Sequence, residues 1–217
     1  MPRRRVHDLD RLLDVAERLT VDLGAAGVTV RGLATAADVP NGTIYHAFGS
    51  LNALLAQVWL RAAKAFLGLQ TELIEQALAA APDPATAARN AVVAAAMTPA
   101  VFAEGRPAAA RLLLTVRREE LLGPDLPDAD ADALHGLDTQ LVQVLIRLAQ
   151  LVWGRRDRHA VDVITTCVVD LPTALFRRAI TGPAVDGSSV IDAELRQRLA
   201  AAVRAVLAIP PITTRKG

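Results

Sequence analysis

The sequence has few aromatic residues and a single cysteine. Phe, Trp and Tyr make up 3% of its 217 residues, whereas 52% are hydrophobic, with alanine and leucine prominent among them. This composition favours helices and argues against a sheet-rich fold. Cys167 alone can form neither an intramolecular disulfide nor a cysteine-rich zinc site, so we expect it to be a small core residue.

Net charge and long apolar runs are equally scarce. The formal net charge is +1, so composition alone does not indicate a nucleic-acid-binding protein. The basic start leads into charged residues and does not resemble a secretory signal. No uncharged apolar run approaches the roughly 20 residues that span a bilayer. We therefore expect a cytoplasmic protein.

No group of residues indicates catalysis or metal binding. His7, His46, His135 and His159 lie on different segments, without a paired carboxylate or the spacing of metal ligands. The sequence contains neither a phosphate-cradling glycine loop nor a nucleophile elbow. We expect no enzymatic activity, no cofactor and no metal.

Proline, glycine and aspartate divide the chain into about ten predicted helices with no convincing strand, which is an all-α fold. Thr29, Ser50, Asp83 and Asp157 can each cap a helix, and Thr98–Pro99 repeats the pattern of a cap before a first-turn proline. The first three predicted helices cover about 8–23, 30–37 and 41–47. Seven more are predicted to start near Ser50, Pro84, Pro99, Pro107, Asp157 and Ser189, and after Gly123-Pro124, which ends the helix before it.

Pro172 lies inside the predicted helix 158–181. It lacks the N–H that the carbonyl of residue 168 would accept, so we expect this helix to bend. The final helix should end before Ile209-Pro210-Pro211, leaving a disordered tail over residues 210–217.

The segment from residue 24 to 55 is the most informative. Two short helices joined by about three residues have the geometry of a helix-turn-helix, whose second helix enters the DNA major groove. Thr43, Tyr45 and His46 would point outward from that helix. The apolar residues that would pack the motif against the first helix are Val30, Leu33, Ala34, Val39, Ile44 and Phe48.

This segment closely resembles the DNA-binding signature of the tetracycline-repressor (TetR) family. The signature has a glycine, a Thr-hydrophobic-Arg helix start, a short turn, and Gly-Thr-hydrophobic-Tyr-x-x-Phe before a small residue. The matching residues are Gly24, Thr29, Arg31, Leu33, Ala34, Val39, Gly42, Thr43, Ile44, Tyr45, Phe48 and Ser50.

The resemblance implies a DNA-binding role for named residues. It assigns phosphate contacts to Thr29, Arg31, Tyr45 and His46, and base contacts to the start of the recognition helix, Asn41, Gly42 and Thr43, which Pro40 precedes and Ser50 follows. Arg3, Arg4 and Arg5 form a predicted flexible arm that could reach phosphates or a minor groove.

Three departures from the family pattern bear on DNA affinity. Asp38 and Pro40 stand where most members have glycine and serine, and Leu51-Asn52 replaces Lys-Glu, which removes a phosphate-binding lysine. Six arginines within residues 1–50 are matched by six carboxylates. We predict weaker and more salt-sensitive DNA binding than in a typical member.

The remainder of the chain resembles the family's ligand-binding and dimerisation domain. We predict a DNA-binding domain over residues 1–49 and this second domain over 50–209, with homodimerisation through the helices at about 158–181 and 190–208. Candidate residues for contact with a small, mostly apolar effector are Trp59, Phe66, Met97, Phe102, Leu113, Arg117, Gln143 and Trp153.

The resemblance implies a ligand-responsive repressor that binds a palindromic operator. Its ligand would bind a conformer whose recognition helices are wrongly spaced, and this shift in population would release the operator. Within the same family, an activator or a ligand-independent regulator remains open. From another class, the chain could be a helical protein-interaction module that has lost DNA binding, which the departures at Leu51 and Asp38 permit.

Overall fold

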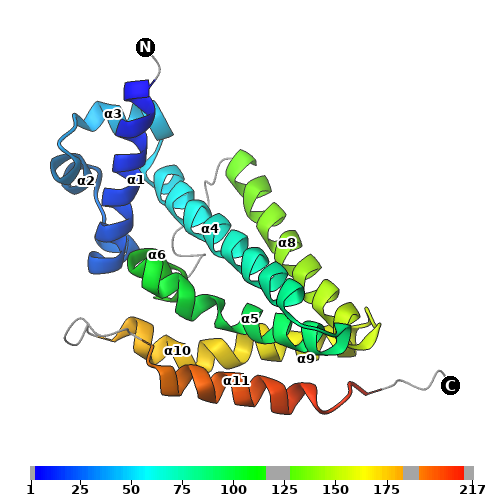
Figure 1. The fold of residues 1–217 in the computed structure, drawn as a ribbon. Coiled ribbons are helices and arrows are strands. Elements are labelled where there is room, and N and C mark those ends of the chain that lie inside the picture. The colour runs from blue at the N-terminus through cyan, green and yellow to red at the C-terminus, as the bar shows by residue number, and fades with distance from the viewer. Residues whose placement is uncertain (1–2, 116–127, 183–190, 213–217) are drawn as a thin grey trace. The chain divides into compact units, whose positions relative to one another are not determined.

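The structure, a computed structural model, describes residues 3–115, 128–182 and 191–212, with side chains from residue 9 to 114 in the first of these ranges. Its described residues are all helix, turn or irregular, so the predicted all-helical fold is confirmed (Figure 1). The elements are α1 (Arg3–Leu23), η1 (Ala25–Gly27), α2 (Val30–Ala37), α3 (Asn41–Phe48), α4 (Leu51–Ala80), α5 (Pro84–Gly105), α6 (Pro107–Thr115), α8 (Asp128–Trp153), α9 (Arg158–Thr165), η2 (Thr166–Asp170), α10 (Leu171–Thr181) and α11 (Ala193–Leu207).

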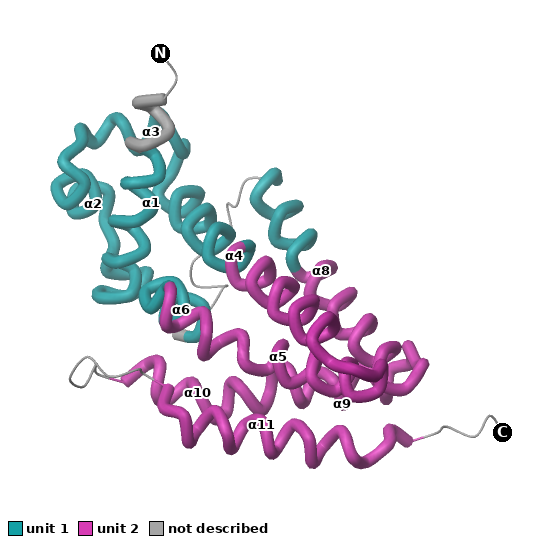
Figure 2. Tube along the Cα trace, viewed as in Figure 1, with its two compact units in different colours: residues 1–64, 106–137 teal, residues 65–105, 138–217 magenta. Residues whose placement is uncertain are grey.

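The chain forms two compact units (Figure 2). Unit 1 comprises residues 1–64 and 106–137, and unit 2 comprises residues 65–105 and 138–217. Both α4 and α8 begin in unit 1 and continue into unit 2. The predicted boundary after residue 49 stays a prediction.

The core of unit 1 joins α1 to the two short helices that follow it. Leu12 and Ala16 of α1, Leu33 of α2 and Ile44 of α3 are completely buried. Helix α1 packs on α2 and α6, and α2 packs on α3. The apolar spacing in the sequence predicted the packing of α2 on α1, because residues three and four apart share one helix face, but it did not predict the packing of α6 on α1.

Four of the predicted helix caps are confirmed. In each case a side-chain oxygen accepts a hydrogen bond from a backbone N–H three residues later, which satisfies a donor that the helix leaves free. The four bonds run from Gly32 to Thr29 (3.1 Å), Ala53 to Ser50 (3.0 Å), Thr86 to Asp83 (2.9 Å) and Ala160 to Asp157 (3.4 Å).

The beginning of α1 differs from the prediction. The predicted helix starts near Asp8, after a flexible arm, whereas the structure places Arg3, Arg4 and Arg5 in the first turns of α1. Arginine is a good helix former, so it can extend a helix whose later residues are held by packing. The side chains of these three arginines lie outside the described part of the structure.

The prediction of a new helix at Thr98–Pro99 is wrong. Helix α5 continues through Pro99 to Gly105, and the Thr98 hydroxyl donates to the Ala94 carbonyl oxygen at 3.4 Å instead of capping. Ala95, Ala96 and Ala100 around the proline are completely buried. The packing of these small residues keeps the helix intact where the local pattern favours a break.

A side chain from α4 compensates for the proline. Pro99 has no N–H to donate to the carbonyl of Ala95, four residues earlier. Gln70, which is only 1% exposed, donates its side-chain Nε2–H to that carbonyl oxygen at 3.4 Å. The Oε1 atom of Gln70 is buried and has no hydrogen-bond partner among the described residues. Unit 2 therefore holds one buried acceptor that remains unsatisfied within its described residues.

Pro172 disrupts its helix through a π-helical turn. The segment η2 separates α9 from α10, and the Leu171 N–H donates to the carbonyl of Thr166, five residues back instead of four. The π turn contains one more residue than an α-helical turn. The chain therefore stays helical up to Pro172, which has no N–H to donate to the preceding turn. The predicted bend stays a prediction, and the structure shows a π turn just before Pro172.

The helical segment Arg158–Thr181 is long and apolar enough to span a membrane by length and composition, as no other described helix is. Within the most apolar 18-residue stretch of this segment, a third is buried inside the chain. Its central turn η2 packs on α5, and α10 packs on α5 and α11. The segment is thus a core element of unit 2 that leaves apolar residues partly uncovered.

The start of the last helix differs from the prediction. Helix α11 begins at Ala193 with Asp192 as its cap, whose Oδ1 accepts from the Leu195 N–H at 2.7 Å. The predicted start near Ser189 lies outside the described residues, and Ile191, predicted on the helix, is buried just before the cap. Aspartate suits this position because its carboxylate also complements the positive end of the helix dipole.

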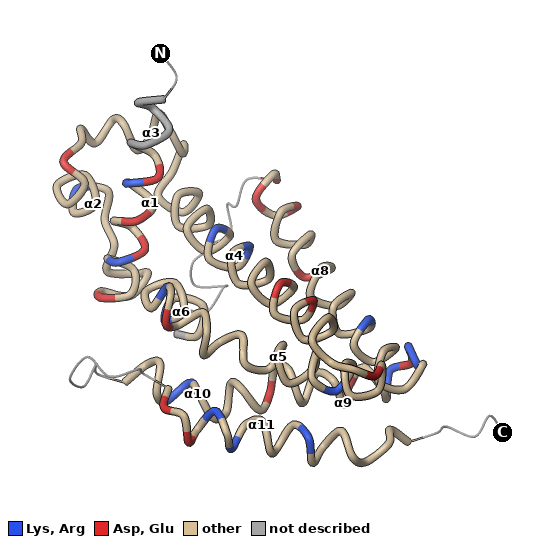
Figure 3. The backbone as a smooth tube through the Cα atoms, in the orientation of Figure 1, with Lys and Arg blue, Asp and Glu red and all other residues tan. Residues whose placement is uncertain are grey.

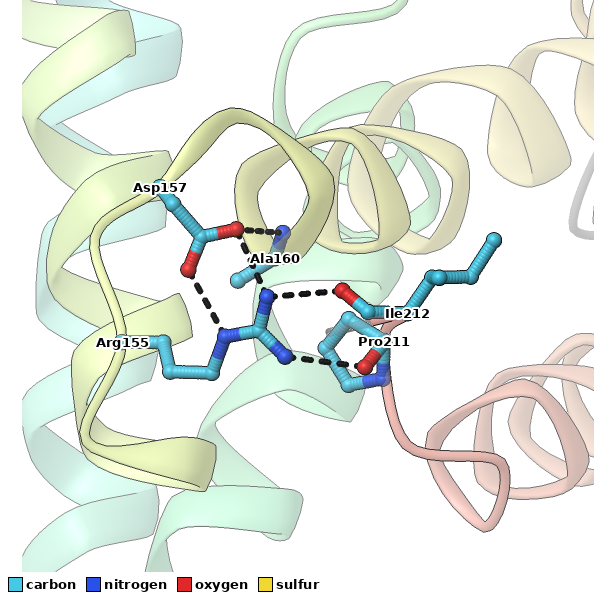
Figure 4. Close-up of polar contacts among 5 residues, drawn as sticks. All are labelled: Arg155, Asp157, Ala160, Pro211 and Ile212. Atoms are coloured by element: carbon cyan, nitrogen blue, oxygen red, sulfur yellow. Dashed lines mark hydrogen bonds and ion pairs between the residues drawn. The ribbon is translucent and has the colours of Figure 1, made fainter. Parts of the chain in front are cut away.

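Arg155 anchors the segment after α11 (Figure 4). Its guanidinium donates to both carboxylate oxygens of Asp157 at 2.7 and 2.8 Å, and to the carbonyl oxygens of Pro211 and Ile212 at 2.8 and 2.9 Å. The hydrogen bonds from Arg155 lower the pKa of Asp157 to about 2. The sequence predicted disorder from residue 210 onward, but Arg155 holds Pro211 and Ile212, while residues 213–217 lie outside the described part.

A double-mutant cycle tests the link between Gln70 and Pro99. Gln70→Leu should lower the free energy of unfolding by about 1–3 kcal/mol, because the Ala95 carbonyl is left without a donor. In the Pro99→Ala background the same substitution should cost much less, since the restored N–H fills that role. Urea unfolding of the four proteins measures both costs, and equal costs in the two backgrounds would contradict the link.

Candidate DNA-binding surface

The surface of α3 is polar on its outward side. Ile44 anchors the helix in the core, whereas Asn41, Gly42 and His46 are exposed and Thr43 is half-buried. Tyr45 is 55% exposed although its ring is mostly apolar. An aromatic ring that the chain leaves uncovered has its hydroxyl free to reach an external acceptor. The outward positions predicted for Tyr45 and His46 agree with these exposures.

The turn before α3 depends on Asp38. This residue has φ 56° and ψ 50°, the left-handed conformation that glycine adopts without strain, and its N–H donates to the carbonyls of Ala34 and Thr35. Among non-glycine residues, aspartate and asparagine tolerate this conformation best. Asp38 therefore supports the turn between the two helices, but it adds an exposed negative charge beside the start of α3.

One residue separates the end of α3 from the cap of α4. Gly49 has φ 76° and donates its N–H to the Tyr45 carbonyl oxygen at 2.9 Å, which closes α3. Ser50 then caps α4 directly. The side-chain-free backbone at residue 49 allows this sharp reversal, because a Cβ would disfavour the positive φ. The recognition helix and α4 are consequently joined with almost no slack.

Gly42 has no folding reason that the structure shows. It lies exposed inside α3, and a Cβ added there would meet no atom within 4 Å. Glycine inside a helix costs about 0.5–1 kcal/mol relative to alanine. A residue that weakens the helix and leaves its outer face bare is suited to close approach by another molecule.

Charges of both signs lie along α1 (Figure 3). Arg61 of α4 forms ion pairs with two of its carboxylates, at 2.8 Å to Asp14 and 3.3 Å to Glu17. Arg31 is exposed at the second residue of α2. Because Arg61 neutralises part of the acidic charge of α1, the charge along α1 is more positive than the neutral count over residues 1–50 suggests. Sequence reasoning missed Arg61, which no local motif marks.

The residues predicted to contact an effector are only partly brought together. The rings of Phe66 on α4 and Phe102 on α5 meet edge to face, with centroids 5.5 Å apart. Gln143 is exposed, so it does not line the interior, and Arg117 lies outside the described residues. The half-buried members of the predicted set are Trp59, Phe66, Met97, Leu113 and Trp153.

Gln70 belongs with Phe66 and Phe102 although sequence reasoning missed it. Residues 66 and 70 share one face of α4, and residues 95 and 102 share the facing side of α5. The signal in the sequence was a lone amide in an otherwise apolar stripe.

Cys167 is fully buried, and burial raises the pKa of its thiol to about 11, which agrees with its predicted role in the core. No three potential metal ligands lie together among the described side chains.

Comparison with known proteins defines this arrangement further. Residues 12–58 match the family model described as "Bacterial regulatory proteins, tetR family". No curated protein matches the chain.

Solved structures of regulators are similar to the chain over nearly its whole length. A putative tetR family transcription regulator from Shewanella sp. PV-4 is 19% identical, with a TM-score of 0.61, over 92% of this chain and 95% of that one. A putative transcriptional regulator from Pseudomonas aeruginosa PAO1 is 18% identical, with a TM-score of 0.66, over 96% and 92%. FadR from Bacillus subtilis, solved in complex with stearoyl-CoA, is 16% identical, with a TM-score of 0.58, over 91% and 95%.

The short helices α2 and α3 with their tight turn define the helix-turn-helix class of DNA-binding proteins. Within that class, residues 12–58 form a DNA-binding domain that matches the tetR family of bacterial regulatory proteins. The solved structures show that the remaining helices have the fold of the same regulators.

Gly42→Ala separates folding from DNA binding. We expect the substitution to raise the free energy of unfolding by about 0.5–1 kcal/mol, because alanine is the better helix former. The added methyl should nevertheless weaken DNA binding if DNA approaches the bare face. Gly68→Ala is the matched control, since Gly68 is also an exposed helix glycine with open space around its Cα.

Urea unfolding and fluorescence anisotropy on the same preparations give both quantities. Unchanged DNA affinity in Gly42→Ala would mean that the exposed face of α3 does not approach DNA closely.

Asp38 offers a second test. Asp38→Asn keeps a residue that tolerates the left-handed turn and removes the charge, so it should tighten DNA binding and reduce its salt dependence. Asp38→Gly should do the same and also stabilise the fold by about 1 kcal/mol, because the backbone strain is relieved. Anisotropy titrations at several salt concentrations measure the effect on DNA. If neither variant changes DNA affinity at low salt, the charge at residue 38 lies away from the DNA.

Proposed function

We propose that the chain is a homodimeric repressor that binds a palindromic operator and is released from it by a small, mostly apolar ligand. The observation that best supports DNA binding, the first part of this proposal, is the bare face of α3. Gly42 leaves that face open, exposed Asn41 and half-buried Thr43 flank it, and the fold itself gains nothing from the glycine. A small polar face allows side-chain contacts with base edges in the major groove.

The remaining proposed contacts serve the DNA backbone. Exposed Arg31, Tyr45 and His46 have side chains that can donate to phosphate oxygens. Thr29 is exposed too, although its hydroxyl oxygen already accepts from the Gly32 N–H, so its hydroxyl proton remains for a phosphate. Such contacts fix the position of α3 without reading sequence. We keep Pro40, Ser50 and Arg3 to Arg5 in the proposed interface as its flanks.

The segment Arg158–Thr181 supports a homodimer. Only a third of its most apolar 18-residue stretch is buried within the chain. Val161, Val169, Leu171 and Leu175 are half-buried. A second copy that pairs this segment and α11 with their counterparts would cover those side chains. Two copies would also present two recognition helices, which a palindromic site with half-sites one DNA turn apart requires.

The interior of unit 2 supports a mostly apolar effector with one hydrogen-bond donor. Phe66 and Phe102 supply aromatic surface, and the buried Oε1 of Gln70 supplies an acceptor that no described residue satisfies. An unsatisfied buried acceptor is costly, so a ligand donor there would contribute affinity and selectivity. The FadR structure with stearoyl-CoA shows that a relative of this fold accommodates a large ligand.

Regulation would follow from a shift between two conformations. A ligand that binds better to the conformer with wrongly spaced recognition helices lowers operator affinity by its differential affinity for the two states. Helix α4 is the natural connection, because only Gly49 and Ser50 separate it from α3 and because it carries Phe66 and Gln70.

The second candidate function is a helical interaction module without DNA binding. Leu51 at the start of α4, where the family pattern has a lysine, and the balanced charges of α1 favour it. Leu51→Lys distinguishes the two functions, because a restored cation tightens DNA binding only if the helix-turn-helix contacts DNA. An unchanged affinity for every DNA tested would favour the interaction module.

Two substitutions in the helix-turn-helix should differ in kind. Arg31→Ala should weaken binding to all DNA sequences alike and reduce the salt dependence, because a phosphate contact is lost. Thr43→Ala should instead change the preference among sequences, because a base contact is lost. Anisotropy with the preferred site and single-base variants of it measures both effects. Equal losses for both variants on every sequence would refute these roles.

Leu175→Glu tests the proposed dimer. A buried carboxylate in the interface should convert the protein to a monomer and reduce operator affinity, because one half-site alone remains for each chain. Leu151→Glu is the control, since Leu151 is an apolar residue on α8 with 40% exposure and no place in the proposed interface. Analytical ultracentrifugation gives the mass of each variant. A Leu175→Glu dimer with unchanged affinity would show that this face is not the interface.

A further inference from the structure

A hollow of about 510 Å³ lies between the first turns of α5 and the last turn of α11, two helices that pack on each other within unit 2. Its volume is within the range of small-molecule sites. None of the residues named in the proposed function contributes to it. The hollow is lined by Thr86, Arg89, Asn90, Arg204 and Ala208.

The lining is cationic and rich in donors. Arg89 and Arg204 bring two guanidinium groups, Asn90 an amide and Thr86 a hydroxyl, while none of the described residues that line the hollow carries a carboxylate. Other described arginines of unit 2, such as Arg147 with Glu75 and Arg196 with Glu104, are paired with carboxylates. Guanidinium groups form bidentate, charge-assisted hydrogen bonds with phosphate and carboxylate groups. The lining thus matches an anion.

The carboxylate of Asp83, which interacts with Arg89, is already engaged as a helix cap. Asp83 caps α5 and accepts the Thr86 N–H at 2.9 Å, and this bond is the main reason that its pKa lies below the ordinary value. Arg89 makes a smaller contribution to the same shift. Asp83 offsets one of the two positive charges, so the hollow retains a positive balance. The N-terminal end of α5 adds a favourable potential for an anion.

One side of α11 can take part in the proposed dimer without covering the hollow. Leu199, Val203 and Leu207 are buried on the side that packs within the unit. At about 100° per residue, Arg204 lies on one flank of this stripe, whereas half-buried Val206 lies on the other. A partner that covers the flank of Val206 would leave Arg204 accessible.

We infer that this hollow binds a small anion carrying a phosphate or carboxylate group, held between Arg89 of α5 and Arg204 of α11. The site is separate from the Phe66–Gln70–Phe102 cluster and does not depend on the effector proposed for it. Because its two arginines come from different helices, an anion would join α5 to the end of α11 and stabilise unit 2.

Isothermal titration calorimetry on the full-length protein tests the site. Inorganic phosphate and citrate are the two probes, each titrated at constant ionic strength maintained with sodium chloride. We expect saturable binding of at least one of them, and the tighter probe identifies phosphate or carboxylate as the preferred group. Arg89→Gln and Arg204→Gln should each weaken binding roughly tenfold or more, because each removes charge-assisted hydrogen bonds.

Arg198→Gln is the matched control. Arg198 is also an arginine of α11, but it pairs with Glu194 at 2.5 Å and does not line the hollow. The Arg198→Gln variant should bind the anion as the unchanged protein does. All three variants should unfold at similar urea concentrations. The absence of saturable binding of both probes would overturn the inference. So would an equal loss in Arg198→Gln, or a loss of operator binding in the other two variants, which would assign their arginines to DNA phosphates.

Discussion

The connection between α3 and α4 is the constraint on which the rest of the structure depends. Gly49 reverses the chain in a left-handed conformation, and Ser50 caps α4 at once. From there α4 continues for 30 residues without interruption, a length of about 45 Å. Ile44 fixes α3 to the core, and Arg61 ties the same α4 to the carboxylates of α1. A change in the direction of α4 therefore cannot leave the recognition helix where it was.

Unit 2 combines stable packing with one unfulfilled interaction. Its small side chains let α5 pass Pro99 without a break, and Gln70 replaces the missing donor. The same replacement leaves the Oε1 of Gln70 buried without a partner among the described residues. A purely structural core would seldom retain such an atom, whereas a core that accepts a ligand has a use for it. The buried amide of Gln70 and the missing backbone donor of α5 thus share one cause, Pro99.

Local chemistry made much of the fold predictable from sequence. The caps at Thr29, Ser50, Asp83 and Asp157 were predictable because each involves a side chain and a backbone N–H only three residues apart. Thr98–Pro99 showed the same pattern but is buried in α5, where tertiary packing overrides it. Gln70, Arg61 and the Arg155 anchor depend on partners 25 to 57 residues away, which spacing alone cannot reveal. For the same reason Gln143 was placed in a pocket although it is exposed.

The most direct test is fluorescence anisotropy of the purified protein with the DNA upstream of its own gene, beside an unrelated fragment, at several salt concentrations. A sequence-specific regulator with an exposed recognition helix should bind the upstream DNA saturably, prefer it over the unrelated fragment, and lose affinity as salt rises. Equal binding to both fragments even at low salt would contradict the account, because the bare face of α3 would then read no sequence there.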